Sequence, residues 1–180
     1  MTRSGSSGSR STILYGERMF QELGNAQARA SAGLRLYRPA DFAQVLELYS
    51  AVGWTTYTKA PDVLERALVG SATVVVAMML FPAEIAPTEI AGVGGERVVG
   101  LARVVSDGET ICYLQDVLVH PSAQRIGLGT RLVEAVLEPY AEVRHKVLLT
   151  DDESGQRAFY QALGYSSIEG TTLRAFTRFG

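Results

Sequence analysis

Residues 116–137 read DVLVHPSAQRIGLGTRLVEAVL and join a buried strand to an amphipathic helix through a glycine-spaced turn. The strand pattern ends at Val119, Pro121 marks a turn, and Gly127 and Gly129 stand where the helix begins. The inner face of this helix is apolar, with Leu128, Leu132, Val133, Val136 and Leu137 at helical spacing. The stretch therefore predicts a strand, a turn and a helix in direct succession.

The composition of this turn is typical of an anion-binding loop. Glycine has no Cβ, so the backbone at Gly127 and Gly129 can approach a ligand closely. The first N–H groups of a helix have no partner within the helix and attract negative charge. We therefore expect a phosphate or pyrophosphate cradle, made by Gln124, Arg125, Ile126, Gly127, Leu128, Gly129 and Thr130.

Two common phosphate loops fit the turn poorly. A dinucleotide-binding loop needs a third glycine at position 132, where this chain has Leu132. An ATP-type loop needs Gly-Lys-Ser/Thr, whereas the sequence Gly129-Thr130-Arg131 contains no lysine. A nucleotide-phosphate binding module remains a rival reading, with these two departures against it.

The rest of the chain predicts an α/β protein with a mixed, mostly antiparallel central sheet of about six to seven strands flanked by helices. Three consecutive strands joined by hairpins precede a strand–helix–strand unit. The predicted strands cover residues 34–37, 73–80, 97–106, 110–119, 146–150, 165–168 and 173–179. Helices are expected after Pro39 and Pro61, from about 128 to 137, and from about 154 to 163, where Gly164 ends the last one.

Composition along the chain predicts one folded domain with an N-terminal extension. Residues 1–11 are dominated by Ser and Gly and are expected to form a flexible leader. Residues 12–33 have an apolar spacing that suits a short helical extension, and residues 34–180 form the domain. The proline- and glycine-containing stretch from Phe81 to Glu96 predicts a long hairpin loop.

Composition and charge exclude several classes of protein. Of 180 residues, 47% are hydrophobic and 20% charged, which is typical of a globular protein. The net charge of −2 is too balanced for binding nucleic acid through bulk charge. Cys112 is the single cysteine and the two histidines lack metal-site spacing, so we expect no disulfide and no metal. The apolar run 73–81 is too short to span a membrane and nothing resembles a signal peptide, so we expect a cytoplasmic protein without membrane contact.

Three segments carry a resemblance to the GCN5-related N-acetyltransferase (GNAT) superfamily. The cradle at 124–129 resembles the family's Q/R-x-x-G-x-G/A loop, which binds the pyrophosphate of acetyl-CoA. LQDVLVHP at 114–121 resembles the family's fourth strand, and AFYQALGY at 158–165 resembles its last helix. The resemblance covers about residues 34–180 and implies the acyl-CoA N-acyltransferase fold, with acetyl-CoA as co-substrate. GWTTYT at 53–58 looks like a bacterial subgroup whose acceptors are mostly unassigned.

The resemblance also implies roles for particular residues. The backbone of Val117, Leu118 and Val119 would hold the pantetheine arm and polarise the thioester carbonyl. Tyr160 stands where the family keeps its general acid. A phenol with a pKa of about 10 can protonate a departing thiolate once water is excluded. The implied reaction is the direct attack of an amine on the thioester.

The general base is left open by the sequence. The family often has Glu or His at the places of Tyr113 and Gln115, and neither residue here is a convincing base. Asp116 is ionisable, but strict alternation places it on the face of Leu114, and only a bulge would redirect it. A water chain ending at Asp116, an amine that is already neutral, and a purely structural Asp116 all remain open.

The acceptor is expected to be a small amine. In the family the loop between the first two helices lines the acceptor pocket, and this loop contains Trp54 and Tyr57. Residues 1–34 carry a net charge of +2, so the remainder carries −4, which favours a cationic, partly apolar amine over an anionic acceptor. An aminosugar and a protein amine are alternatives. Because these folds often pair, a homodimer is one expected assembly. The rival reading from another class is a non-catalytic acyl-CoA-binding or sensor protein on the same fold.

Overall fold

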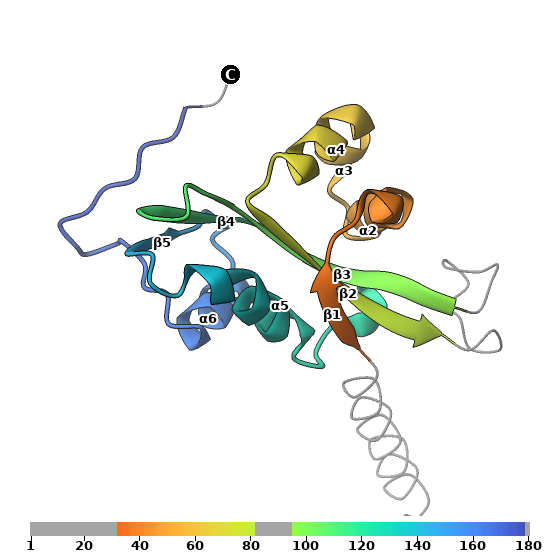
Figure 1. Cartoon of the computed structure of the whole chain (residues 1–180). Helices are drawn as coiled ribbons and strands as arrows, with labels where there is room; N and C mark the ends of the chain where they lie inside the picture. Colours follow the sequence, from red (N-terminus) through yellow and green to blue (C-terminus); the bar gives the residue numbers. More distant parts are fainter. Residues whose placement is uncertain (1–31, 82–94, 179–180) are drawn as a thin grey trace, which may run out of the picture. The chain divides into compact units, whose positions relative to one another are not determined.

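A five-stranded mixed sheet forms the centre of the fold (Figure 1). The computed structural model describes residues 32–81 and 95–178. The strands lie in chain order: β1 (Gly33–Leu36), β2 (Thr73–Phe81), β3 (Gly95–Ser106), β4 (Ile111–Val119) and β5 (His145–Val147). Neighbours from β1 to β4 are antiparallel, and β5 is parallel to β4. The predicted fold class, a mixed and mostly antiparallel sheet flanked by helices, is confirmed.

The predicted count of six to seven strands is wrong for the described residues, which contain five. The two strands expected at 165–168 and 173–179 do not form within residues 165–178. Leu173 is 64% exposed and Phe176 is 93% exposed. Their alternation indicates a local preference for extended backbone, but a strand also needs a neighbour to take its hydrogen bonds. The predicted leader, the predicted extension up to residue 31 and residues 82–94 of the predicted hairpin loop lie outside the described residues.

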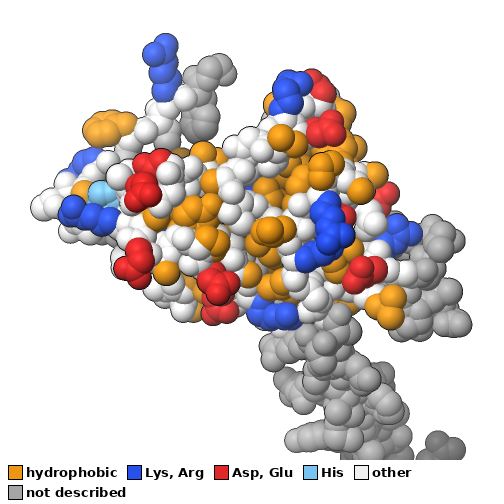
Figure 2. All heavy atoms as spheres, viewed as in Figure 1, with side chains coloured by type: hydrophobic (Ala, Val, Ile, Leu, Met, Phe, Trp, Pro, Cys, Tyr) orange, Lys and Arg blue, Asp and Glu red, His pale blue; other side chains and the backbone are white. Residues whose placement is uncertain are grey.

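The chain divides into two compact units, and the boundary between them falls after Val147. In the first unit, helices cover both faces of the sheet. On one face, α2 (Phe42–Ala51), the single turn α3 (Thr55–Thr58) and α4 (Pro61–Val69) follow one another. The apolar side chains of α2 and α4 share one core with the sheet: Val45, Leu48, Tyr49, Leu64, Leu68, Val74, Val76, Met78, Val98, Leu101 and Leu118. The outer end of α4 carries side chains of both charge signs (Figure 2), including an ion pair between Arg66 and Asp62 at 2.9 Å.

The helix α5 (Leu128–Leu137) packs against the opposite face of the sheet. At Gly100 in β3, an added Cβ would lie 2.8 Å from Leu132 Cδ1 and 3.2 Å from the Leu118 carbonyl oxygen. A side chain here would force Leu132 to shift, so glycine favours the close approach of α5 to the strand. No helix among the described residues is both long and apolar enough to cross a membrane.

The strand β4 contains a bulge at Gln115. Arg103 of β3 pairs with Asp116, while the next residue, Val104, pairs with Leu114, so Gln115 has no partner in β3. Strict alternation placed Asp116 on the face of Leu114, and the extra residue breaks that alternation. Because cross-strand partners share a face, Asp116 lies with Arg103 on the side covered by α2.

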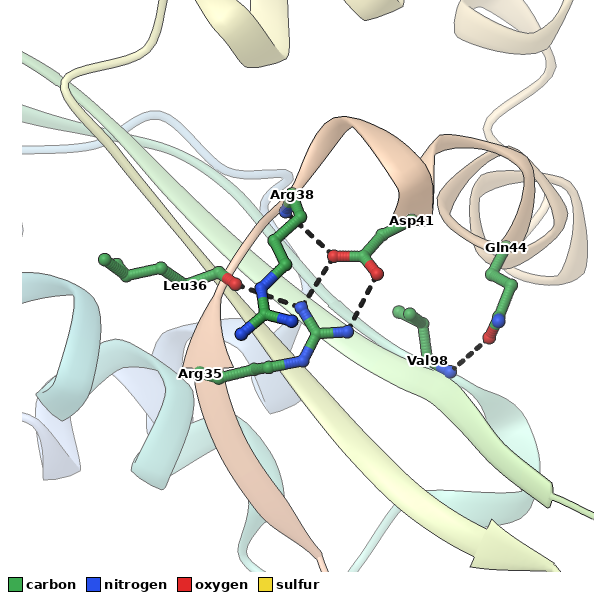
Figure 3. Close-up of polar contacts among 6 residues, drawn as sticks. All are labelled: Arg35, Leu36, Arg38, Asp41, Gln44 and Val98. Carbon is green, nitrogen blue, oxygen red and sulfur yellow. Dashed lines mark hydrogen bonds and ion pairs between the residues drawn. The ribbon is translucent and has the colours of Figure 1, made fainter.

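A charged contact fixes the point where α2 follows β1 (Figure 3). Both guanidinium nitrogens of Arg35 donate to the Asp41 carboxylate, at 2.7 and 2.8 Å, and the Arg38 backbone N–H donates at 2.8 Å. These donors hold the pKa of Asp41 below its usual value; the Arg35 hydrogen bonds contribute most, and partial burial opposes them. Further along α2, Gln44 Oε1 accepts from the Val98 N–H at 2.9 Å. The start of α2 is therefore tied to β1 and its body to β3.

Asp41→Asn is expected to lower the free energy of unfolding by about 1–2 kcal/mol at pH 7, because the bidentate ion pair is lost. A lowered carboxyl pKa stabilises the folded state above the unfolded value of about 4, and that stability is lost as the pH falls through the folded pKa. The difference between wild type and variant in the free energy of unfolding, measured with urea, should therefore shrink as the pH falls below about 4. The control is Asp62→Asn, which removes a largely exposed ion pair with Arg66 and should have little effect at either pH. A pH-independent loss at Asp41 would contradict the assignment.

Candidate active site

The edge of β4 is open beyond Tyr113. β5 pairs only with Ile111–Tyr113, and within the described ranges no strand pairs with β4 on that side from there to Val119. The N–H of His120 donates to the Val99 carbonyl at 2.9 Å, towards β3. Because backbone groups alternate sides along a strand, the N–H groups of Val117 and Val119 face the open edge. A ligand lying along this edge would find two backbone donors already in place.

Leu118, between these two residues, faces inward. Its side chain is 2% exposed and belongs to the core shared with α2 and α4. By the same alternation its own N–H faces β3. Leu118 thus anchors the segment and leaves the exposed edge to Val117 and Val119.

The turn after β4 begins with a 3-10 turn, Pro121–Ala123, capped by the His120 ring, which accepts from the Ser122 N–H at 3.2 Å. The Gln124 Nε2 donates to the Val119 carbonyl oxygen at 3.2 Å. This bond ties the turn back to the last residue of β4. Gln124 therefore acts on the position of the loop in addition to being a donor at its edge.

Two left-handed residues shape the predicted cradle. Arg125 has a φ of 62° and Gly127 has a φ of 76°. A non-glycine residue in this region is uncommon and marks local strain. Between and after them, Ile126 and Leu128 are 4% and 2% exposed. Ile126 and Leu128 thus anchor the loop in the core, while Arg125 and Gly127, which alternate with them, are exposed.

The N-terminus of α5 is left available to an anion. Gly127 is its N-cap and offers no side chain to cap it, and the first turn holds no acidic residue. The first helical bond runs from the Arg131 N–H to the Gly127 carbonyl. The N–H groups of Leu128, Gly129 and Thr130 precede that bond, and they carry the positive end of the helix dipole. These features fit a phosphate or pyrophosphate group.

A buried polar network lies on the α2 side of the sheet, next to this strand. Asp116 is 1% exposed, and its Oδ2 accepts from Tyr49 Oη at 2.7 Å and from Arg103 Nε. Arg103 Nη1 also donates to Ser71 Oγ at 3.1 Å, at the connection between α4 and β2. Asp116 Oδ1 is buried without a hydrogen-bond partner among the described residues. The network joins β3, β4, α2 and the residues before β2.

The two tyrosines beside Asp116 are held in the neutral form. Burial, and then the charge of Asp116, raises the pKa of the Tyr49 phenol far above its usual value. Tyr57 shows the same causes in the same order and a raised pKa, with Gln115 and Arg103 opposing the shift. Burial disfavours the charge of Arg103, but Asp116 and Tyr49 outweigh it and raise its pKa. The phenols can therefore donate hydrogen bonds over the whole physiological pH range.

The predicted acceptor residues lie against this network. Trp54 and Tyr57 stack with ring centroids 5.8 Å apart, and both contact the Tyr49 ring, at 5.9 and 5.2 Å. Trp54 remains 37% exposed. The predicted loop at 53–57 contains the helical turn α3, which carries Tyr57. We call Tyr49, Trp54 and Tyr57 the aromatic cluster; it brings the predicted residues Trp54, Tyr57 and Asp116 together.

Sequence reasoning missed Tyr49 and Arg103 as members of the site. Tyr49 falls in the helix expected after Pro39, and nothing near it in the sequence indicates a partner for its hydroxyl. Arg103 was passed over within the strand GERVVGLARVVS, although a charged residue inside a buried strand signals a partner. The partner is Asp116 on the next strand.

Tyr160 lies in the second compact unit, residues 148–180, and is described there by itself. It is part of α6 (Ser154–Ala162), which ends in a left-handed glycine, Gly164, with a φ of 85°. The Tyr165 N–H donates to the Tyr160 carbonyl and the Gly164 N–H to the Gln161 carbonyl, both at 3.0 Å. This pair of bonds is a Schellman motif. The motif brings Tyr165 back over the helix end, where its ring contacts the Tyr160 ring edge to face at 6.0 Å.

Metal and thiol chemistry find little support in the described ranges. Residues 32–81 and 95–178 hold no group of three or more His, Cys, Asp or Glu that could bind a metal ion. Cys112 is fully buried, and burial raises the pKa of its thiol, opposed by the charge of Lys146. It behaves as a small core residue.

Comparison with known proteins shows what this chain is similar to. A family model described as an acetyltransferase (GNAT) domain matches residues 88–167, a range that includes β4, the cradle and Tyr160. The chain is similar to the structure of a GNAT-family acetyltransferase from Streptococcus pneumoniae TIGR4, at 26% identity and a TM-score of 0.62, covering 83% of this chain and 96% of that one.

Two further structures show the same fold. One is an acetyltransferase from Streptococcus agalactiae 2603, at 16% identity and a TM-score of 0.59, with 83% of this chain and 92% of that one covered. The other is an acetyltransferase from Trypanosoma brucei, at 20% identity and a TM-score of 0.56, with 83% and 99% covered. A search of curated proteins finds no match.

Proposed function

We propose that this chain, of which residues 88–167 match a GNAT acetyltransferase domain, transfers the acetyl group of acetyl-CoA to the amine of a small molecule. The observation that carries the proposal is the continuity of two backbone features. The open edge of β4 leads, through a loop with two left-handed residues, into the uncapped N-terminus of α5. A linear ligand with an acyl group at one end and a pyrophosphate further along would meet donors at both places.

The residues divide the binding of this co-substrate between them. The pyrophosphate would be held by the loop from Gln124 to Thr130, chiefly through backbone N–H groups and the positive end of α5. The pantetheine arm would lie along Val117, Leu118 and Val119, next to the open edge. Acetyl-CoA supplies an activated thioester, and the chain supplies position and hydrogen bonds.

The proposed reaction requires the protein to stabilise a developing negative charge and to protonate the leaving thiolate. When the amine nitrogen bonds to the carbonyl carbon, the N–H groups of Val117 and Val119 stabilise the charge that develops on the carbonyl oxygen. When the carbon–sulfur bond breaks, Tyr160 Oη donates a proton to the sulfur. The acceptor reacts as a neutral amine and releases its own proton to solvent. Asp116 supplies a buried carboxylate within the same strand.

The acceptor side is formed by Trp54 and Tyr57. Exposed aromatic faces favour an apolar group and attract a cationic one. Trp54 is partly exposed and stacks on Tyr57, whose phenol lies in the field of Asp116. A small, partly apolar amine suits these surroundings.

Thermal unfolding with acetyl-CoA, CoA, ATP or NAD added separately tests the co-substrate. Acetyl-CoA or CoA at 100 times its Kd should stabilise the protein by about 2.7 kcal/mol, which raises Tm by roughly 5–10 °C. ATP and NAD should give smaller shifts, because the loop lacks their glycine and lysine signatures. A larger rise in Tm with ATP or NAD than with acetyl-CoA would contradict the assignment of acetyl-CoA as co-substrate. Binding of CoA with no thiol release on any amine would favour the acyl-CoA sensor instead.

Gly127→Val is expected to weaken acetyl-CoA binding more than about tenfold, because a branched side chain is strained at a φ of 76° and blocks the backbone approach. Gly108→Val is the matched control, since Gly108 has a φ of 84° in the hairpin between β3 and β4. Both variants should lose stability, but only the first should lose affinity in calorimetric titration. If Gly127→Val and Gly108→Val bind acetyl-CoA with equal affinity, the assignment of residues 124–130 as the pyrophosphate-binding loop is wrong.

Tyr160→Phe should lower kcat roughly 10²-fold or more while leaving the Kd for acetyl-CoA nearly unchanged, as expected for loss of a general acid. Tyr165→Phe keeps the ring that contacts Tyr160 and should change kcat only a few-fold. The measurement is thiol release at saturating acetyl-CoA. An unchanged kcat in Tyr160→Phe would take Tyr160 out of the chemistry.

A further inference from the structure

We propose that Asp116 is a positioning residue: together with Arg103 and Tyr49, it locks the aromatic cluster onto the acyl-binding end of β4. The proposal rests on the proposed function and assigns a part to a carboxylate that does not reach the substrate. Its basis is the way in which one carboxylate oxygen joins separate elements of the site.

The surroundings of Asp116 rule out direct contact with an acceptor. Its side chain is 1% exposed, and both donors, Tyr49 Oη and Arg103 Nε, come to the same oxygen. The other oxygen is buried and makes no hydrogen bond to the described residues. An ion pair arranged in this way costs free energy that a well-packed apolar pair would not. The presence of this ion pair is therefore better explained by the positions in which it holds its neighbours than by a gain in stability.

Asp116 stands between the two halves of the proposed site. Along the chain it lies between Gln115, the bulged residue, and Val117, whose N–H faces the open edge. Through space it is bonded at 2.7 Å to Tyr49, the ring that Trp54 and Tyr57 both contact. A shift of the carboxylate would move the backbone donor and the acceptor wall relative to each other.

Arg103, on the neighbouring strand β3, is the second residue that holds Asp116 in place. It pairs with Asp116 across the strands, and its second nitrogen reaches Ser71 at 3.1 Å, beyond the end of α4. The bulge turns Asp116 to the face where Tyr49 and Arg103 both reach it. Because amine attack needs the nitrogen within about 3–3.5 Å of the carbonyl carbon, a small displacement between the two halves would slow the reaction.

The first test uses Tyr49→Phe, which keeps the aromatic ring and removes only its bond to Asp116. Trp54 is the single tryptophan of the chain, so its fluorescence reports on the aromatic cluster alone. Acrylamide quenching of Trp54 should increase by roughly 1.5-fold or more, while the Kd for acetyl-CoA stays within about twofold. With 2-phenylethylamine as acceptor, KM for the amine should rise about tenfold, the effect of one charge-assisted hydrogen bond.

Tyr140→Phe is the matched control. Tyr140 Oη also makes a single hydrogen bond of 2.7 Å, to Thr73 Oγ1, and is 7% exposed, but it takes no part in the network. Its loss should lower Tm without changing Trp54 quenching or KM. If Tyr49→Phe has the same effects as Tyr140→Phe, the network is structural only and the proposal is wrong.

The second test separates positioning from proton transfer. Asp116→Asn leaves the buried charge of Arg103 unpaired and should lower kcat/KM about 10²-fold. Adding Arg103→Gln removes that charge, and the neutral amide pair should regain at least fivefold of the loss. A general base at Asp116 would show no recovery, and the acidic limb of the pH profile of kcat/KM would disappear in both variants.

The failure of this proposal is distinct from that of the proposed function. Wild type that binds acetyl-CoA but acetylates neither 2-phenylethylamine nor any of a panel of small amines contradicts the proposed function. Acrylamide quenching of Trp54 needs no acceptor, so it tests the positioning role of Asp116 even if no amine is acetylated. Wild-type turnover together with an unchanged Trp54 in Tyr49→Phe overturns the positioning role alone.

Discussion

The buried ion pair between Arg103 and Asp116 is the contact on which the arrangement of the site depends. Two charges at 6% and 1% exposure persist inside a sheet only when each has a partner and the geometry is close. The bulge at Gln115 makes this contact possible, because without the extra residue Asp116 would lie on the face of Leu114. Once formed, the pair also recruits Tyr49 and so connects the sheet to α2.

The sequence predicts those parts of the fold that depend on local patterns. The helices at α2, α4, α5 and α6, and the strands up to β4, follow from apolar periodicity and from glycine and proline at their ends. The strands expected after residue 164 do not form in the described residues, because strand formation depends on a distant partner that no local pattern specifies. The bulge was allowed as an option but could not be located, since one extra residue leaves the alternation of polar and apolar side chains almost unchanged.

The candidate site divides along the same line. The turn that leads into α5 was predictable because Gly127 occupies a left-handed position that glycine prefers, and the glycine spacing can be read directly from the sequence; anion binding by this turn stays a prediction. The place of Tyr160 in the last turns of a helix was predictable because Gly164, four residues further on, ends that helix in a Schellman motif; its role stays a prediction. The partners of Asp116 were not, since Tyr49 is 67 residues away and becomes a neighbour only through packing.

In the proposed function, this contrast reflects two kinds of recognition. The acyl carrier would be bound by backbone N–H groups of β4 and α5, which depend on chain conformation and leave most side chains free to pack in the core. The acceptor would be bound by the side chains of Trp54 and Tyr57, which contact a ring held by the buried Asp116 network. A different acceptor would therefore require new side chains only at Trp54 and at Tyr57 in α3. The Asp116 network need not change with them, because Tyr49 on α2, which it holds, can keep its place relative to the backbone donors of β4.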